Sequence, residues 1–319
     1  MRWRKLGQVF DFATSGFEEE FSGFAQSPQA LVFADRVRFY FSTRPESTDG
    51  KYVSVVQYVD MTRDLGSVIR RSESSVVPLG ALGTFDEHGI FPFSVFRHGD
   101  EVWGYSNGWN RRKSVSVDTA IGLAISKDGG ETFQKIGPGP VLGPSLHEPF
   151  LVCDPFVRVF DGVFHMWYIH GIRWSRRPEG GTPERTYVIA HATSGDGIEW
   201  VREARPIIPQ FDPDECQALP TVIQIGSRYH MMFCHRGTFD FRNDPAMGYR
   251  LGYAWSDDLV QWHRADEDAG IDMTPGEWDG DMMCYPHLFA VDDQVYLAYN
   301  GNSFGRQGFG LAALESEEK

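Results

Sequence analysis

The chain has 319 residues, of which 41% are hydrophobic and 14% aromatic, so it can bury a sizeable core. Its formal net charge of −14 argues against nucleic acid or an anionic membrane as the main partner. The sequence has no apolar stretch of membrane-spanning length, and no apolar run of a secretory signal follows its basic N-terminal residues. We therefore expect a cytoplasmic protein.

One sequence unit recurs five times along the chain. Five prolines follow one another at intervals of 64, 63, 65 and 66 residues, and an aromatic residue lies thirteen positions after each proline. A fixed period with alternating apolar residues indicates stacked or radial β units. The prolines are Pro28, Pro92, Pro155, Pro220 and Pro286, and the aromatics are Phe41, Tyr105, Tyr168, Phe233 and Tyr299.

Each unit is predicted to contain four antiparallel strands. In 155–168 and 220–233, apolar residues alternate on both sides of a short turn that contains glycine, which is the pattern of a β-hairpin. A third strand follows, as at 187–192, and the turn at 194–200 leads into a fourth. Four strands in a repeat of this length are typical of a propeller blade.

The two ends of the chain are predicted to meet in the same blade. The fifth unit ends at its third strand, 309–315, whereas residues 3–10 resemble the fourth strands of other units. An N-terminal strand that completes the last blade would close the ring and leave no open sheet edge there. We expect Trp3 to be buried in this blade, with Leu6 and Val9 packed into it.

These patterns predict an all-β protein, a five-bladed β-propeller with four-stranded antiparallel blades. We expect residues 1–319 to form one domain, with blades that start near residues 25, 89, 152, 217 and 283 and with residues 1–10 completing blade five.

The segments ahead of the five prolines are predicted to converge at one mouth of the channel, because the innermost strand of each blade lines the channel. Four of these segments are acidic. Paired carboxylates in a half-buried cleft suit glycosidic chemistry, since burial and like charge separate their pKa values. The acidic and histidine residues expected in this pocket are Asp86, Glu87, His88, His147, Glu148, Asp154, Asp214, Glu215, Asp279 and Asp281.

A second group of polar residues lies at the ends of the second strands. Asn107, His170 and His235 each lie two positions beyond a unit aromatic, and Arg44 lies near the same level in the first unit. These groups suit sugar hydroxyls or a carboxylate, although a histidine at a strand end can also simply bind a loop backbone. The residues expected to contact substrate are His88, Glu148, His170, His235, Asn107 and Arg44.

The five-unit period, the Asp154-Pro155 pair, the Glu215-Cys216 pair and the repeated Ser-x-Asp turns resemble the five-bladed propeller glycosidases. That superfamily includes glycoside hydrolase family 43, the invertase and levansucrase families and the mannoside phosphorylases. The resemblance implies a carbohydrate-active enzyme that acts on a small or activated sugar by carboxylate acid–base chemistry. It also implies that Asp154 is the orienting carboxylate and Glu215 the proton donor.

The chain is an atypical member of that group, because blade one departs from the family pattern. The family has an aspartate next to the first proline, where this chain has Gln26 and Ser27. We therefore expect Glu87 or Asp281 to supply the missing base. Some members hold a calcium or another ion on the channel axis, and His287 would be its ligand here; a structural histidine is the alternative.

Two other functions remain open. Ser126–Phe133 fits the Asp-box turn of sialidases, and the arginines at 44, 173 and 236 could form a sialidase-like cluster. The missing blade-one carboxylate instead favours a sugar-binding propeller without catalysis. Two acids that share one cavity about 5 to 10 Å apart would favour the enzyme.

The four cysteines do not form a disulfide framework in a chain this long and lack the spacing of a zinc site. We expect reduced thiols, and a small-molecule carbohydrate as the partner.

Overall fold

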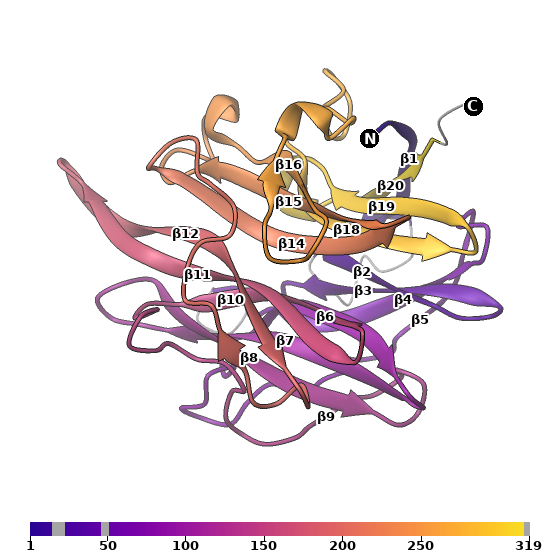
Figure 1. The fold of residues 1–319 in the computed structure, drawn as a ribbon, viewed down its shortest axis with the longest axis horizontal. Coiled ribbons are helices and arrows are strands. Elements are labelled where there is room, and N and C mark those ends of the chain that lie inside the picture. Colours follow the sequence, from indigo (N-terminus) through magenta and orange to yellow (C-terminus); the bar gives the residue numbers. More distant parts are fainter. Residues whose placement is uncertain (15–22, 46–50, 316–319) are drawn as a thin grey trace.

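The computed structural model describes residues 1–14, 23–45 and 51–315. Its strands form five antiparallel sheets of four strands each (Figure 1). The first strand of each sheet contacts the first strands of both neighbouring sheets, so the five sheets close into a ring. The five-bladed propeller predicted from the sequence is confirmed.

Four of the five blades take their strands in chain order from the axis outwards, whereas the outer strand of blade five is the N-terminal β1. Blade one consists of β2 (Gln26–Val32), β3 (Arg36–Thr43), β4 (Val55–Thr62) and β5 (Val68–Arg71), and blade two of β6 (Ile90–His98), β7 (Glu101–Arg111), β8 (Val117–Ser126) and β9 (Gln134–Lys135). Blade three consists of β10 (Val152–Phe160), β11 (Val163–Arg177), β12 (Gly180–Ser194) and β13 (Val201–Arg202), and blade four of β14 (Glu215–Ile225), β15 (Arg228–Gly237), β16 (Arg250–Ser256) and β17 (His263–Arg264). Blade five consists of β18 (Cys284–Val291), β19 (Gln294–Asn300), β20 (Gly308–Leu314) and β1 (Trp3–Asp11).

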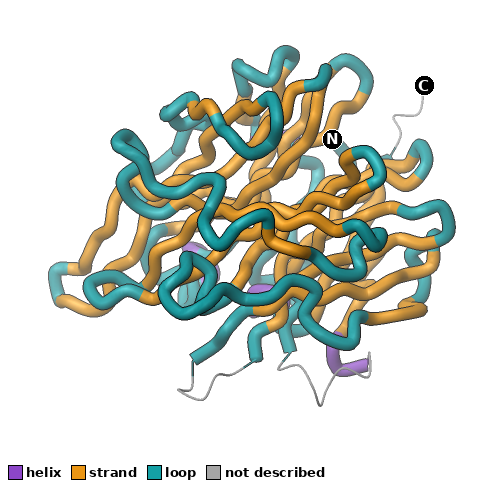
Figure 2. Tube along the Cα trace, turned by 90° about the horizontal axis from the view of Figure 1, so that it is seen from below, coloured by secondary structure: helices purple, strands orange, loops and turns teal. Residues whose placement is uncertain are grey.

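Helices in the described ranges are single turns between strands (Figure 2), namely η1 (Phe12–Thr14), η2 (Pro245–Met247), η3 (Asp266–Asp268) and α1 (Asn302–Gly305). None of these helices has the length and apolar character needed to cross a membrane.

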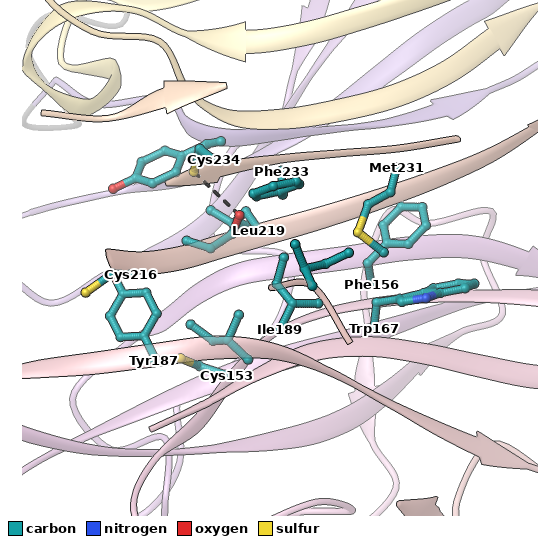
Figure 3. Close-up of a cluster of buried hydrophobic side chains, with 14 of the residues drawn as sticks. Cys153, Phe156, Trp167, Tyr187, Ile189, Cys216, Leu219, Met231, Phe233 and Cys234 are labelled. Atoms are coloured by element: carbon teal, nitrogen blue, oxygen red, sulfur yellow. Dashed lines mark hydrogen bonds between the residues drawn. The ribbon is translucent and has the colours of Figure 1, made fainter. Parts of the chain in front are cut away.

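The hydrophobic core consists of layers between neighbouring blades. Between blades three and four, a cluster extends from Cys153 and Tyr187 at one end to Phe156 and Trp167 at the other (Figure 3). The aromatic residue thirteen positions after each unit proline lies in one of these layers, and all five such rings are at most 1% exposed. Burial of a large ring stabilises each blade interface by about 1.5–3 kcal/mol, which explains why the spacing recurs.

The turns between third and fourth strands have one hydrogen-bonding pattern in blades two, three and four. In blade two, Ser126 Oγ donates to Asp128 Oδ1 at 2.6 Å, and Asp128 accepts from the backbone N–H groups of Glu131 and Thr132 at 3.0 Å. Asp196 and Asp258 hold the corresponding turns. The Ser-x-Asp motif is therefore a turn motif that joins the outer strands of a blade.

Blade five is closed by the N-terminus. β1 pairs antiparallel with β20, with Trp3 opposite Leu314 and Phe10 opposite Phe309. Trp3 is buried as expected, and its indole N–H donates to the Ala269 carbonyl at 3.0 Å. The expectation that Leu6 packs inside the blade is wrong, because its side chain is 37% exposed; Phe10, at 1%, is the main buried anchor.

Deletion of residues 1–10 is expected to make the protein aggregate or unfold at a markedly lower temperature, because it exposes the edge of β20 and removes two buried aromatic rings. The matched pair Phe10→Ala and Leu6→Ala tests the packing itself by denaturant unfolding. Phe10→Ala should cost about 3–5 kcal/mol, whereas Leu6→Ala should stay within about 0.5 kcal/mol. A deleted protein that stays monomeric with an unchanged Tm would contradict this role of β1.

Candidate active site

The residue before each unit proline occupies a recurring irregularity in the first strand. Ser27, Asp154, Leu219 and Tyr285 have φ angles of 54°, 55°, 48° and 58°. This left-handed region is uncommon for residues other than glycine. The strand register shifts at the same point in all five first strands, as it does between Cys153 and Phe156 in β10. The sequence thus places a bulge in each blade at the channel mouth.

These bulges border a central cavity to which all five blades contribute. Phe91, Asp154, Leu219 and Tyr285, each directly before a unit proline, line it together. The hollow measures about 690 Å³ when counted out to the open solvent at its mouth, and about 100 Å³ of it is open to the centres of water-sized spheres. The other lining residues are Arg44, Trp109, Thr119, Leu151, Cys153, Ile169, Arg185, Tyr187, Arg236, Phe241, Arg242, Tyr249 and Phe304.

Asp154 is the only carboxylate among the described residues that line this cavity. Its side chain is buried, with 6% exposed, and Oδ2 accepts a hydrogen bond from the Leu219 backbone N–H at 3.2 Å. Burial raises the pKa of Asp154 to about 7, although that hydrogen bond and Arg185 partly oppose the shift. An acid with this pKa can both give and take a proton near neutral pH.

Four arginines surround the same space. Arg236 is 3% exposed; its Nε donates to the Tyr249 hydroxyl at 3.2 Å and its Nη1 to the Gly237 carbonyl at 2.6 Å. Arg185 lies over Trp109, with 5.5 Å between its Cζ and the ring centroid. Burial lowers the pKa of Arg44, and the positive charges of Arg242 and Arg185 act in the same direction. The exposed Arg242 lies at the rim and donates to Glu184 at 3.2 Å.

Aromatic side chains form much of the cavity wall. The hydroxyls of Tyr187 and Tyr249 are 3.1 Å apart, and burial raises the pKa of Tyr249 to about 12 and that of Tyr187 well above its usual value. Both hydroxyls are therefore neutral donors at physiological pH. Apolar rings with a few convergent polar groups are a typical environment for a small ligand.

Four of the eight acidic residues predicted for the pocket have a different position, in an ion pair that recurs in four blades. The acid lies in the loop ahead of the first strand, or at its first residue in the case of Glu215, and pairs with a basic residue on the fourth strand of the same blade. Glu215 accepts from Arg264 Nη1 at 2.7 Å, and Asp279 pairs with Lys5 at 2.6 Å. The four pairs are Asp86–Lys135, Glu148–Arg202, Glu215–Arg264 and Asp279–Lys5.

The unit aromatics reinforce two of these pairs. Tyr168 donates its hydroxyl to Glu148 at 2.6 Å, and Tyr299 donates to Asp279 at 3.0 Å. Glu148 and Glu215 therefore connect strands within their blades and do not line the central cavity.

The other proposed bases also lie outside the cavity lining. Glu87 is in the loop before β6, where it accepts from the Gly83 N–H at 2.9 Å, and His88 Nε2 is 3.8 Å from its carboxylate. Asp281 has an exposed side chain before β18. Of the four residues predicted to be catalytic, the structure places Asp154 alone in the cavity.

The predicted substrate contacts divide in the same way. Arg44 lines the cavity, whereas Asn107 is fully buried and donates to the Phe91 carbonyl at 2.6 Å. Burial lowers the pKa of His170 and of His235, and His235 lies 3.9 Å from Glu215. Neither histidine lines the cavity.

His287, the candidate metal ligand, is fully buried on β18. Burial lowers its pKa well below the usual value, and the charge of Arg158 adds to this effect. In the described part of the chain, no group of three or more His, Cys, Asp or Glu side chains could hold a metal ion. The positive charge of Arg158 acts on His287, and no carboxylate of the described residues forms an ion pair with it, which is a poor environment for a divalent cation.

Sequence reasoning missed Arg185, Arg242 and most of the aromatic wall. One signal was available: Thr119 and Tyr187 each begin the apolar stretch of a third strand, Tyr249 lies directly before the third strand of blade four, and all three line the cavity. The position directly before each unit proline was a second signal, because four of these residues line the cavity, whereas most of the acidic residues further upstream do not.

No family model matches the chain. Two proteins of Mycobacterium tuberculosis strains, named "Uncharacterized protein MT1551" and "Uncharacterized protein Rv1502", are each 34% identical to it over 318 residues, which cover 99% of this chain and 100% of theirs.

Solved structures resemble the chain in fold at low identity. A structure named "Glycoside hydrolase" matches with a TM-score of 0.73 and 16% identity over 99% of this chain and 92% of its own. A thermostable family-43 glycoside hydrolase matches with a TM-score of 0.64 and 12% identity over 94% of this chain and 93% of its own. A third structure matches with a TM-score of 0.66 and 14% identity over 93% of this chain and 86% of its own. It comes from a family of mannoside phosphorylases containing glycoside hydrolases that target β-1,2 mannosidic linkages in Candida mannan. The chain therefore belongs to the family of MT1551 and Rv1502, and it has the five-bladed propeller fold of these glycoside hydrolases and phosphorylases.

Proposed function

We propose that the protein is a carbohydrate-active enzyme that binds a small sugar in the central cavity and uses Asp154 to protonate the glycosidic oxygen. The observation that carries this proposal is a buried carboxylic acid with a pKa of about 7 in a central cavity lined by aromatic and arginine side chains. A raised pKa is what a general acid needs near neutral pH. The fold supports the same class of chemistry.

The reaction follows from the groups that line the cavity. A nucleophile attacks the anomeric carbon, the bond from that carbon to the leaving oxygen breaks, and the departing alcohol takes the proton of Asp154. Hydrolysis with a second carboxylate as base would need another acid about 5 to 10 Å away. The described lining has none, so a nucleophile that is already anionic, such as phosphate, fits this cavity better than carboxylate-activated water.

A sugar-binding propeller without catalysis is the second candidate, and the same lack of a second described carboxylate in the cavity favours it.

A reducing compartment such as the cytoplasm is supported by the four cysteines, all free and buried.

Asp154→Asn is expected to lower kcat by about 10²–10⁴, because it removes the proton that the leaving alcohol takes up. Turnover of a panel of 4-nitrophenyl and alkyl glycosides, with and without inorganic phosphate, is the measurement. Asp257→Asn, which removes an exposed carboxylate paired with Arg228, is the matched control and should leave kcat unchanged. A wild-type rate for Asp154→Asn would refute the assignment, and a wild-type protein that binds sugars but turns over none would favour the non-catalytic candidate.

Asp154 also predicts a pH dependence of stability that needs no substrate. Its folded pKa of about 7 lies above the unfolded value of about 3.9, so its contribution is fully present below about pH 4 and is lost as pH rises through 7. Asp154→Asn cannot ionise, so it should gain about 2–4 kcal/mol on the wild type between pH 4 and pH 8. Urea unfolding of both proteins across this range measures the difference, and a constant difference would argue against a raised pKa.

Glu215→Gln separates the structural position of Glu215 from the catalytic role predicted for it. The Arg264 side chain is 1% exposed and would keep only Asp266 as a charged partner. We therefore expect a loss of about 1–3 kcal/mol in unfolding free energy, with kcat retained in the folded fraction. The double variant Glu215→Leu/Arg264→Met should recover much of this loss. An unchanged Tm with abolished turnover would instead support Glu215 as the proton donor.

A further inference from the structure

The central cavity concentrates positive charge in a protein whose formal net charge is −14. Arg44, Arg185, Arg236 and Arg242 line it, and Asp154 is the one carboxylate that the described residues place opposite them. This excess of cations over anions is the reverse of the composition of the chain as a whole.

Two buried arginines elsewhere in the blades have carboxylate partners, whereas Arg158 donates to the Val95 and Val157 carbonyls. Arg38, which is fully buried, pairs with Asp60 at 2.6 Å, and Arg264 pairs with Glu215 at 2.7 Å. This is the expected arrangement, because an uncompensated buried charge costs several kcal/mol.

Arg236 and Arg185 depart from that pattern, since neither forms an ion pair with a carboxylate of the described residues. The oxygens that accept from Arg236 are neutral: the Tyr249 hydroxyl and the Gly237 and Thr238 carbonyls. These bonds use Nε and Nη1 and leave Nη2 for a ligand. Arg185 donates to the Ser116 hydroxyl at 3.4 Å, which is a long and weak contact.

Aromatic rings lie beside both guanidinium groups, and that of Arg236 is also held by its hydrogen bonds. The Cζ of Arg236 is 3.6 Å from the centroid of Phe241, and that of Arg185 is 5.5 Å from Trp109. Stacking on a ring holds the guanidinium plane and keeps its N–H edge available. A planar donor edge suits a carboxylate or phosphate, which can accept two parallel hydrogen bonds.

A second basic hollow adjoins Arg185 through its contact with Ser116. The β11–β12 hairpin extends beyond the other strands of blade three (Figure 1), and Ser116, which accepts from Arg185, lines a hollow beside it. Arg112, Lys113 and Arg176 line that same hollow. A cluster of like charges raises the local concentration of an oppositely charged ligand.

We infer that Arg185 and Arg236 form an anion subsite in the central cavity, so that the sugar ligand carries a carboxylate or phosphate group. The sugar part of this inference rests on the proposed function, whereas the anion subsite does not. The same subsite would accept free inorganic phosphate as a co-substrate, and the experiment has to distinguish these two sources.

Isothermal titration of the full chain with matched ligands tests the inference without turnover. D-Glucuronate and D-glucose differ in one carboxylate, and D-glucose 6-phosphate and inorganic phosphate complete the panel. At least one anionic member should bind ten or more times tighter than glucose and should weaken as ionic strength rises. Selective binding of the sugar acids identifies a charge on the substrate, whereas binding of phosphate alone identifies a free anion; both support the subsite.

Arg185→Gln should weaken the tightest anion at least tenfold and leave glucose binding unchanged. Arg173→Gln is the matched control: Arg173 lies on the neighbouring strand, pairs with Asp214 and does not line the cavity, so its loss should not alter binding. Arg236→Gln is a second variant, and its anion binding is interpreted only if its Tm shows that the protein folds. Anions that bind no tighter than glucose, or equal weakening by Arg185→Gln and Arg173→Gln, would overturn the inference. Tight anion binding without turnover of any glycoside would leave the subsite standing and refute the proposed enzyme.

Discussion

The antiparallel pairing of β1 with β20 is the contact on which the rest of the structure depends, because it joins the two ends of the chain. Without it, blade five would lack its outer strand, and the packing of Phe10 against blade one would be lost. All five blades contribute side chains to the central cavity, so its geometry requires a closed ring. The N-terminal strand thus supports the arrangement in which Arg44 of blade one and Tyr285 of blade five face the same cavity.

Acidic residues have two distinct uses in this propeller. In four blades, a carboxylate in or directly after the loop ahead of the first strand pairs with a basic residue on the outer strand. This pair fixes the loop to its blade. Asp154 lies one step closer to the axis, at the bulge before Pro155, where burial and two arginines act on it in opposite directions. Acidic residues thus stabilise the blades where they pair with an outer strand, and one of them supplies an ionisable group in the central cavity.

The sequence was sufficient for the architecture because the propeller repeats. The prolines mark bulges, the aromatics fill the layers between blades, and the Ser-x-Asp motifs close outer turns, so each pattern reports a local constraint. The site was harder to predict from the sequence, because the alternation of apolar and polar residues does not reveal which of several neighbouring acids faces the axis. Glu215 and Glu148 have the residue type expected of a catalytic acid, but their partners, Arg264 and Arg202, lie far along the chain. Arg185 was missed because a single arginine near a strand start has no distinctive pattern.

A crystal structure of the protein with a bound sugar acid tests the central claim most directly, since the claim is one of geometry. The account predicts the anionic group on Arg185 and Arg236, the ring beside Trp109 or Tyr187, and the glycosidic oxygen within about 2.6–3.2 Å of Asp154. A ligand bound at Glu215, or outside the central cavity with Asp154 facing only protein atoms, would contradict it.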